Sequence, residues 1–558
     1  MVRARGTPLT SRMPAHTRRP VRSGNRAALP ALIAAAACAG GAVAAGTSPQ
    51  APPRPALVVL IAVDQLRGDY IPRWAPQLTG GLGRFSREGA FFSQGRQDHA
   101  VTETAPGHAT MLSGRYPAHT NVVTNEHGVL DPGSPLLELK DVGLGASPRR
   151  FRGTTLYDWM QHANARSRVL SVSRKDRGAI LPVGRAKGDV YWYAGGIFTT
   201  SGWYRDPADT LPGWVREWNA ADPVRKVAGW TWNLLLPDSG AYPEPDSVVV
   251  ENDGRDVAFP HQLTPNIDAA AVVLPNYPIM DSLTLDFTLR GIERLRLGQG
   301  TATDLLVVSL STTDAVGHIY GPDSRELHDQ VLRLDRWLGG FLDSLWKVVP
   351  RERSLLVLTA DHGSVSMPEF ISTVQSRPAA RLWFRDLATE LNTTYGTLLV
   401  GREPFAFHEG LLTGDVAALK RAGINVDSIA RAAVDRMQAT TGVRRVFTPA
   451  TLKAAPGSDP DAVLCRRALP DDFGWLTCGF VAPDYIWSPD IPIAMHGSAQ
   501  PDDQRVPIAF LGPGIRPAQY ADTVSTTDIA PTLAVLLGLR PGERLDGRPL
   551  TQVTGGRR

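Results

Sequence analysis

Five runs of aliphatic residues recur along the chain, each short enough to be a buried strand. The first reads Leu-Val-Val-Leu-Ile-Ala-Val and stops at Asp64. A continuous apolar run without alternation is typical of a parallel strand that is covered on both faces. We therefore predict buried parallel strands at residues 57–63, 169–173, 305–310, 355–359 and 506–511.

Amphipathic helical patterns lie between these runs. The clearest covers residues 324–348, where leucine and valine recur every three or four positions and would form one apolar face. Strands that alternate with helices favour an α/β fold, here a doubly wound, mainly parallel sheet sandwiched by helices. In such sheets the functional residues lie at the carboxyl ends of the strands. We expect this domain to cover residues 56–550.

Two regions interrupt the alternation. Residues from about 185 to 285 are rich in Trp, Tyr, Pro and Gly, and we expect them to form a cap inserted over the sheet. Residues from about 370 to 490 have helical patterns of their own at 380–391 and 429–440, and we expect a second insertion there. The aromatic residues of the first region would either cover the site or fill the core of the insertion, and we favour the core. They are Trp192, Tyr193, Trp203, Trp214, Trp230 and Trp232.

The amino-terminal residues have the pattern of an export signal. Seven arginines lie within the first 26 residues, and residues 27–45 form an alanine-dominated apolar stretch that ends in Ala42-Val43-Ala44. A basic start, a short apolar stretch and a small-residue cleavage site predict a signal peptide over residues 1–45. The Pro-rich residues 46–55 are then a linker. We expect a periplasmic or secreted protein.

A membrane anchor is the weaker interpretation of the same stretch, because it is only weakly apolar and is interrupted by Gly40 and Gly41. We therefore expect no stable membrane span in the mature chain. Cys38 would be a lipoprotein attachment site, but alanine stands three residues ahead of it, where a larger aliphatic residue is usual. Cys465 and Cys478 are either one disulfide of an exported protein or two unpaired buried thiols.

The formal net charge of +4 comes from the leader, since removing its seven arginines leaves 4 − 7 = −3. The remaining chain has no basic excess, so we expect no nucleic-acid partner. The sequence sets no oligomeric state.

Acidic and histidine residues follow the predicted strands directly. A single Asp-His pair is more often a helix cap or a surface pair, but placement after several apolar strands indicates a shared site. Carboxylate and imidazole ligands together suit zinc, whereas an all-oxygen set would suit magnesium or calcium. Three Asp and three His residues can supply the ligands for two metal ions. They are Asp64, Asp314, His318, Asp361, His362 and His496.

A two-metal site needs a group that attacks the substrate. The segment Thr104-Ala105-Pro106-Gly107-His108 has the pattern of a loop that enters a helix, which would place Thr104 at the helix N-terminus. The free amides and the helix dipole favour negative charge there. A threonine hydroxyl is a poor nucleophile by itself, and metal coordination activates it. Taken alone, the segment would more often be an ordinary helix cap.

These motifs, in this order, resemble the alkaline phosphatase superfamily. Val63-Asp64-Gln65, the Thr104 segment, the Asp314/His318 pair, Asp361-His362-Gly363 and His496-Gly497 carry the resemblance, which spans residues 56–550. It implies one zinc held by Asp314, His318 and His496. It implies a second zinc held by Asp64, Asp361, His362 and the Thr104 oxygen. It also implies a phosphothreonine intermediate.

The nucleophile separates the branches of this superfamily. Sulfatases need Cys or Ser at this position, and cofactor-independent phosphoglycerate mutases use Ser, so Thr104 disfavours both. A threonine leaves nucleotide pyrophosphatase/phosphodiesterases and PafA-like alkaline phosphatases. Lys175 and Arg177 resemble the Lys-x-Arg motif of PafA-like enzymes, and Asn125 matches their phosphoryl-binding asparagine. Two cations would favour the extra charge of a monoester through charge-assisted hydrogen bonds. The plainer interpretation of Lys175-Asp176-Arg177 is a solvated charged turn.

We therefore predict a zinc-dependent alkaline phosphatase of PafA type that acts on small-molecule phosphate monoesters. One alternative is an enzyme of the same fold, a phosphodiesterase or nucleotide pyrophosphatase. The other is a protein without catalytic activity that binds metal or phosphate. His108, one helical turn after Thr104, is expected to pack or hydrogen-bond there. No role is assigned to the histidines that lack a strand-end context, which are His99, His119, His127, His261, His328 and His408.

Overall fold

The computed structural model describes residues 54–139, 145–206, 208–402, 404–489, 491 and 493–556. The expected signal peptide with Cys38, and residues 46–53 of the expected linker, lie outside the described residues. Within these ranges every helix is too short or too polar to span a membrane.

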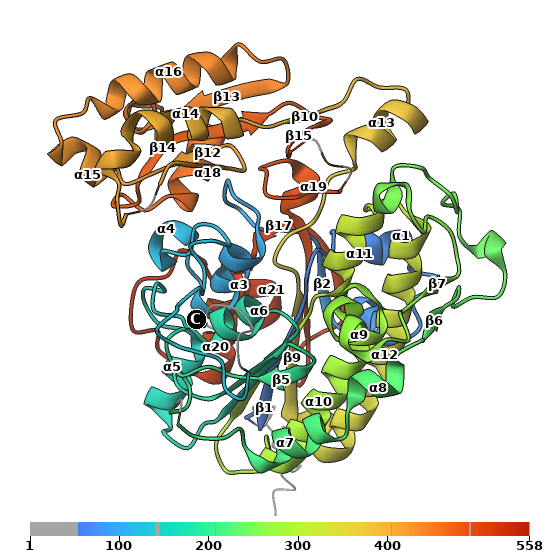
Figure 1. The fold of residues 1–558 in the computed structure, drawn as a ribbon. Helices are drawn as coiled ribbons and strands as arrows, with labels where there is room; N and C mark the ends of the chain where they lie inside the picture. Colours follow the sequence, from blue (N-terminus) through green and yellow to red (C-terminus); the bar gives the residue numbers. More distant parts are fainter. Residues whose placement is uncertain are drawn as a thin grey trace, which may run out of the picture. The chain divides into compact units, whose positions relative to one another are not determined.

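A nine-stranded sheet forms the centre of the fold (Figure 1). Its strands are β1 (Leu57–Val63), β2 (Ala90–Arg96), β3 (Val169–Ser173), β4 (Asp189–Ala194), β5 (Ile197–Thr199), β8 (Asp304–Leu310), β9 (Ser354–Thr359), β16 (Arg505–Leu511) and β17 (Ala518–Ser525). Their order is β17-β2-β16-β9-β1-β8-β3-β4-β5. The five strands from β9 to β4 are mutually parallel. The predicted mainly parallel sheet is confirmed.

The direction of β16 differs from the prediction. This strand is antiparallel to both of its neighbours, β9 and β2. The prediction of a parallel strand at residues 506–511 was therefore wrong in direction. An unbroken apolar run indicates that both faces of the strand are buried, but it does not indicate the direction of the strand. The sequences of β2 and β17 mix polar and apolar residues, and neither strand was predicted.

Helices cover both faces of the sheet (Figure 1). One core lies under α10 (Ile279–Leu295) and α12 (Arg325–Val348), and the other lies under α3 (Thr104–Ser113) and α20 (Ile529–Leu537). Successive residues of β1 alternate between these cores, because strand side chains point to opposite faces in turn. Helix α12 begins where the sequence predicted, and Ser324 Oγ caps it by accepting a hydrogen bond from Leu327 N. The sandwich of a sheet between helix layers is confirmed.

The region expected to be the first insertion is partly built into this sheet. β4 and β5 extend its edge, and the following residues form α7 (Gly213–Ala220), α8 (Pro223–Val227), α9 (Ile267–Val273) and a small sheet of β6 (Thr231–Trp232) and β7 (His261–Gln262). Most of the aromatic residues noted in the sequence are buried, but they fill the two main cores beside the central sheet and not a separate core of the insertion. Tyr193, Trp214 and Trp232 lie in the core under α10, and Trp192 lies in the other.

Residues 380–487 have a sheet and a core of their own, and we call them the inserted subdomain. Its sheet has the order β11-β12-β14-β13, with β11 at Ala406–His408, β12 at Leu411–Thr413, β13 at Val443–Phe447 and β14 at Trp475–Val481. Helices α14 (Arg385–Tyr395) and α16 (Val426–Gln438) pack around residues such as Leu412, Met437 and Leu476. The two helices predicted here start within about five residues of α14 and α16.

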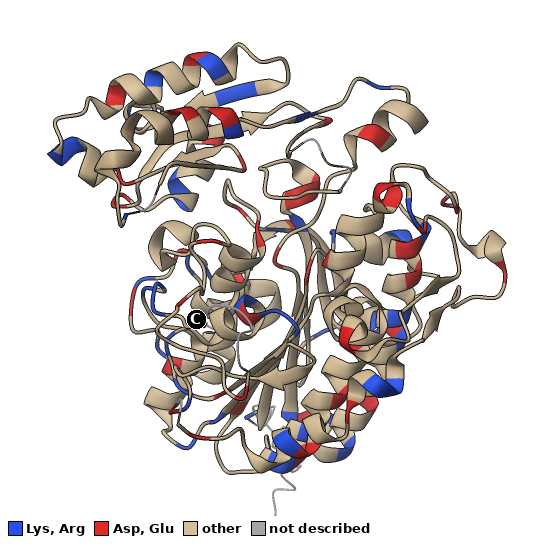
Figure 2. Ribbon diagram, in the orientation of Figure 1, with Lys and Arg blue, Asp and Glu red and all other residues tan. Residues whose placement is uncertain are grey.

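The inserted subdomain contains the disulfide between Cys465, on α18 (Pro460–Ala468), and Cys478, on β14, with a Cα–Cα distance of 6.4 Å. Of the two alternatives, the paired one is therefore present. A small core around this disulfide joins the subdomain to residues that precede Thr104, including Ala100 and Val101. Figure 2 shows charged residues of both signs on the helices, whereas the central strands are nearly free of them.

Candidate active site

The order of the strands brings the predicted ligands together. β1 lies between β8 and β9, and the ends of the three strands are in register, with Val63 opposite Leu310 and Ala62 opposite Thr359. Asp64 follows β1, and Asp361 and His362 follow β9. The helix after β8, α11 (Thr312–Tyr320), carries Asp314 and His318. These loops therefore start side by side at one edge of the sheet.

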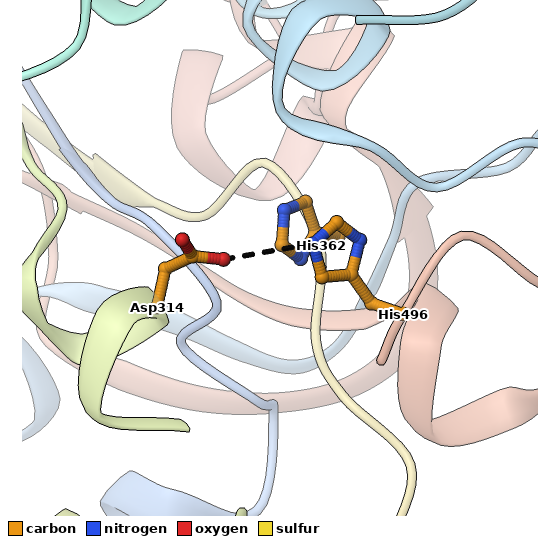
Figure 3. Close-up of side chains that lie close together, drawn as sticks. All are labelled: Asp314, His362 and His496. Carbon is orange, nitrogen blue, oxygen red and sulfur yellow. Dashed lines mark ion pairs between the residues drawn. The ribbon is translucent and has the colours of Figure 1, made fainter. Parts of the chain in front are cut away.

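Among the described residues, two groups of side chains are close enough to hold a metal ion. Asp64, Asp361 and His362 form one group, and Asp314, His362 and His496 form the other (Figure 3), with ligand atoms within 4.8 Å of one another in each. His318 joins the second group, since its Nε2 lies 3.2 Å from Asp314 Oδ1. The resemblance placed His362 in the first group alone, whereas its ring also stacks on that of His496, with centroids 3.6 Å apart.

The three histidines are oriented in the same way. Nδ1 of His318 lies 2.6 Å from Ala494 O, Nδ1 of His362 lies 2.9 Å from Gly363 O, and Nδ1 of His496 lies 2.9 Å from Thr102 O. A carbonyl only accepts, so each Nδ1 must carry the proton. Each Nε2 lone pair is then free to bind a metal, which is the usual arrangement of metal-binding histidines.

The carboxylates are buried with unsatisfied oxygens. Both oxygens of Asp64 and one of Asp361 accept no hydrogen bond from the described residues, although Lys175 Nζ forms an ion pair with Asp64 at 2.6 Å. Burial raises the pKa of Asp64 to about 6, and the charges of Asp314 and Asp361 add to this rise. Buried carboxylates crowded in this way are costly unless a cation compensates them. The donor set thus fits two divalent cations.

Thr104 is the first residue of α3, at the N-terminus that the sequence predicted. All ten residues of this helix are buried. The preceding residue, Glu103, makes no side-chain hydrogen bond to the start of the helix. Instead Asn125 Oδ1 accepts a hydrogen bond from Ala105 N at 2.9 Å, which places this predicted phosphoryl-binding side chain beside Thr104.

Lys175 lies at the centre of the cluster. Its ammonium is 2.6 Å from Asp64 Oδ2, 2.6 Å from Asp314 Oδ2 and 3.3 Å from Thr104 Oγ1. Arg177, in α6 (Asp176–Ile180), is half-buried, and its NH1 lies 3.6 Å from Asp176. The plainer interpretation of this segment as a solvated turn does not fit Lys175, which is buried against both metal groups.

Sequence reasoning gave no role to Gln65. Its Nε2 donates to Asp314 Oδ1 at 3.1 Å and its backbone N–H donates to Asp361 Oδ1 at 3.1 Å, so one residue orients a ligand of each group. The Gly317 of the Asp314–His318 motif leaves room for it, because a Cβ at that position would lie 1.8 Å from Gln65 Oε1. The signal in the sequence was its position after Asp64 in the motif Val63-Asp64-Gln65.

His108 hydrogen-bonds near the site, as expected. Its Nδ1 lies 2.9 Å from Thr104 O and 3.2 Å from Asp361 Oδ2, and its Nε2 lies 2.9 Å from Ser309 Oγ. It thereby links the start of α3 to the loop after β9.

Comparison with known proteins finds a matching family and relatives that cover most of this chain. Residues 58–401 match the family described as type I phosphodiesterase / nucleotide pyrophosphatase. Alkaline phosphatase PhoV of Synechococcus elongatus is 31% identical over 90% of this chain and 94% of its own. Alkaline phosphatase PhoK of a Sphingomonas species is 32% identical over 90% of this chain and 92% of its own.

The crystal structure of wild type alkaline phosphatase PafA is also similar, with a TM-score of 0.80 and 28% identity over 91% of this chain and all of that one. A PafA variant with a threonine, an asparagine, a lysine and an arginine substituted matches with a TM-score of 0.81 and 26% identity over 90% of this chain and all of that one.

Proposed function

Because the chain belongs to the alkaline phosphatase superfamily, in the branch of PafA, PhoV and PhoK, we propose that it hydrolyses phosphate monoesters through a phosphothreonine on Thr104, with two zinc ions as cofactors. One observation carries the proposal. The Lys175 ammonium contacts the Thr104 hydroxyl and a carboxylate of each metal group at the same time. The Thr104 hydroxyl, the Lys175 ammonium and both groups of metal ligands therefore meet at one point.

The metal ligands follow from the donor set. Asp314, His318 and His496 would hold one zinc, and Asp64, Asp361, His362 and Thr104 Oγ1 would hold the other. Mixed nitrogen and oxygen donors with protonated Nδ1 atoms favour zinc over calcium or magnesium. When bound, the ions would supply positive charge that favours loss of the Thr104 proton and stabilises the departing oxygen.

The chain itself positions the reacting groups. Thr104 Oγ1 attacks phosphorus, the new Oγ1–P bond replaces the bond to the ester oxygen, and the alcohol leaves with a proton. Water then attacks the phosphothreonine, which releases inorganic phosphate and returns the proton to Thr104. Thr104 lies at the N-terminus of α3, where the helix dipole would favour the negative charge of a phosphoryl group. Positioning and electrostatics supply most of the rate enhancement in this class of reaction.

Lys175, Arg177 and Asn125 would select monoesters. A monoester has one more unesterified oxygen than a diester, and cationic donors favour its additional charge. The substituted threonine and asparagine of the PafA variant are 21 positions apart, and its lysine and arginine are two apart. Thr104 and Asn125 are also 21 apart (125 − 104), and Lys175 and Arg177 are two apart (177 − 175). This match of residue types and spacing supports the same assignment here.

The decisive measurement compares turnover of monoesters and diesters by the zinc-loaded protein and by Lys175→Ala and Arg177→Ala. We expect the wild type to prefer monoesters and each variant to lose about 10- to 1,000-fold in monoester kcat/KM, as for other lost charged contacts in a transition state. Diester turnover should change much less. Lys187→Ala, which removes an exposed lysine stacked on Trp203, is the control and should resemble the wild type.

Equal losses on both substrates would contradict the roles of Lys175 and Arg177. A wild type that prefers diesters would instead identify the phosphodiesterase named by the matching family. Full zinc occupancy without any turnover would support a silent binding protein.

We also propose that the protein is exported, with residues 1–45 removed as a signal peptide. The disulfide of Cys465 and Cys478 supports this, because stable disulfides are typical of oxidising compartments outside the cytoplasm. Amino-terminal sequencing of the protein released from the periplasm or medium tests it. A mature chain that begins near residue 46 is expected, and an intact leader on active protein would contradict it.

A further inference from the structure

One turn of the inserted subdomain reaches the candidate active site. His408 ends β11, and Glu409 and Gly410 connect it to β12. His408 Nε2 forms an ion pair with Glu103 Oε1 at 2.5 Å, and its Nδ1 lies 3.3 Å from Glu126 Oε1. Glu103 is the residue immediately before Thr104, so a side chain from the subdomain touches the segment that carries the nucleophile.

The other oxygen of Glu103 continues the connection. Glu103 Oε2 accepts a hydrogen bond from Asn125 N at 2.7 Å, and Asn125 Oδ1 accepts one from Ala105 N at 2.9 Å. A single carboxylate therefore holds His408 on one side and the backbone of Asn125 on the other. Because α3 holds the side-chain oxygen of Asn125, the nitrogen of the same amide is the group that would donate to a ligand.

We propose that His408 is a positioning residue, which fixes Glu103 and through it the Asn125 amide that binds the phosphoryl group. This inference rests on the proposed function, since it assumes that Asn125 contacts the substrate. The inserted subdomain would then contribute to catalysis at the candidate active site, which lies at the carboxyl ends of the strands and which we call the strand-end site.

The charges of the pair support the proposal. Glu103 is buried, and a buried carboxylate that loses its partner is strongly destabilised. Burial lowers the pKa of His408, but the carboxylates of Glu103, Glu409 and Glu126 outweigh this and raise it to about 10. His408 is therefore positively charged at neutral pH, beside the buried carboxyl group of Glu103.

A second contact keeps the same turn in place. Glu409 packs on Gly497, where a Cβ would lie 2.6 Å from Glu409 Cγ, and the φ of Gly497 is +109°, a conformation that favours glycine. Gly497 follows His496 and accepts a hydrogen bond from Thr102 N at 3.3 Å. The turn is therefore seated between the segment before Thr104 and the segment that carries His496, which limits how far His408 can move.

The test uses full-length zinc-loaded protein and four variants. They are His408→Ala, His408→Gln, Asn125→Ala and the double variant His408→Ala/Asn125→Ala. Steady-state monoester kcat/KM and the inhibition constant of inorganic phosphate are measured for each. His119→Ala is the matched control, because it removes a surface histidine that pairs with Asp546 at 2.7 Å away from the ligand groups.

We expect His408→Ala to lower kcat/KM about 10-fold, as for other partners that orient a reacting group, and to weaken phosphate inhibition by a similar factor. His408→Gln, which can still donate to Glu103, should recover part of both losses. The double variant should be no worse than Asn125→Ala alone, because the effect of His408 is transmitted through Asn125. The control should match the wild type.

Unchanged phosphate inhibition in folded His408→Ala would overturn the inference, as would effects of His408→Ala and Asn125→Ala that simply multiply. If His408→Ala does not fold, the same readings are taken on Glu103→Gln, which keeps the shape and removes the charge. A wild type without monoester turnover would overturn the proposed function itself, whereas an active wild type with an unaffected His408→Ala overturns this inference only.

Discussion

The strand-end site and the inserted subdomain begin their helices in different ways. In the subdomain, four of the five helices named here are capped by the residue before them, whereas α14 has no side-chain cap. The capped helices are α15 (Val416–Arg421), α16, α17 (Pro449–Ala454) and α18, and their caps are Asp415, Asn425, Thr448 and Asp459. At the site, α3, α6 and α11 receive no such side-chain hydrogen bond from their N-cap residues, all of which are described.

This difference separates two uses of a helix N-terminus. A local cap satisfies the free amides and stabilises the helix. At the site, side chains from elsewhere in the chain take over this part, because Asn125 Oδ1 accepts from Ala105 N of α3 and Asp281 Oδ1 accepts from Thr312 N of α11. Most helices of the subdomain therefore take their caps from the neighbouring residue, whereas α3 and α11 at the site depend on side chains 20 and 31 positions away in the chain.

The largest effect should come from the first residue of α3. Thr104→Ala removes the proposed nucleophile, and we expect monoester kcat/KM to fall by about 1,000-fold or more while zinc occupancy is largely kept. Rapid acid quenching with labelled substrate should trap phosphate on the wild type but not on the variant. Thr104→Ser is the control and should retain labelling. A labelled Thr104→Ala protein would contradict the assignment.

A stability effect should come next, from the inserted subdomain. Replacing both Cys465 and Cys478 by alanine removes a cross-link that closes a short loop, and about 3 kcal/mol of unfolding free energy should be lost. Thermal unfolding followed by circular dichroism measures the loss. Monoester activity below the new transition should persist, because no proposed ligand lies in the subdomain. Reduction of the wild type should reproduce the shift, and identical melting of the two proteins would rule out a stabilising role.

Glu251 is a buried carboxyl group outside both regions. Its titration tests whether the buried carboxylates of the site differ from other buried acids because a cation compensates their charge. Burial raises the pKa of Glu251 to about 9, and Glu326 adds to this rise. Folded protein then keeps a proton that the unfolded chain releases above its ordinary pKa, so the free energy of unfolding falls as pH rises through the window from 4.5 to about 9.

Glu251→Gln removes this dependence, and at pH 8 the variant should be more stable than the wild type by on the order of 2 kcal/mol. Near pH 5 the two proteins should differ little. Urea unfolding of the zinc-loaded proteins at both pH values measures this. A variant that is less stable at pH 8 would show that Glu251 is ionised and compensated in the folded state.

The smallest effect should come from a local cap. Asn425 Oδ1 accepts a hydrogen bond from Ser428 N at the start of α16, and Asn425→Ala should cost about 1 kcal/mol of unfolding free energy. Monoester kcat/KM should not change, because α16 lies in the inserted subdomain and carries none of the proposed site residues. Asn425→Asp, which keeps the cap, is the control. A loss of turnover in folded Asn425→Ala would mean that the subdomain affects the site through more than the turn at His408.

The sequence alone determined the residues at the strand ends. Asp64 and Asp361 could be selected because an apolar run marks a buried strand, and the carboxyl ends of parallel strands meet at one edge. Thr104 followed from a local helix-start pattern. These inferences needed only near neighbours in the chain, and family motifs supplied Asn125, Lys175 and Arg177.

Tertiary structure decided what depends on distant pairs of residues. The direction of β16, the hydrogen bond from Gln65 to Asp314 and the contact of His408 with Glu103 depend on pairs of residues more than 150 positions apart. A local pattern reports whether a residue is buried and in which type of element, but it does not report the distant residue that the fold places opposite it. His408 was therefore given no role from the sequence, although it is the last residue of β11, and its partner Glu103 became visible only in the folded chain.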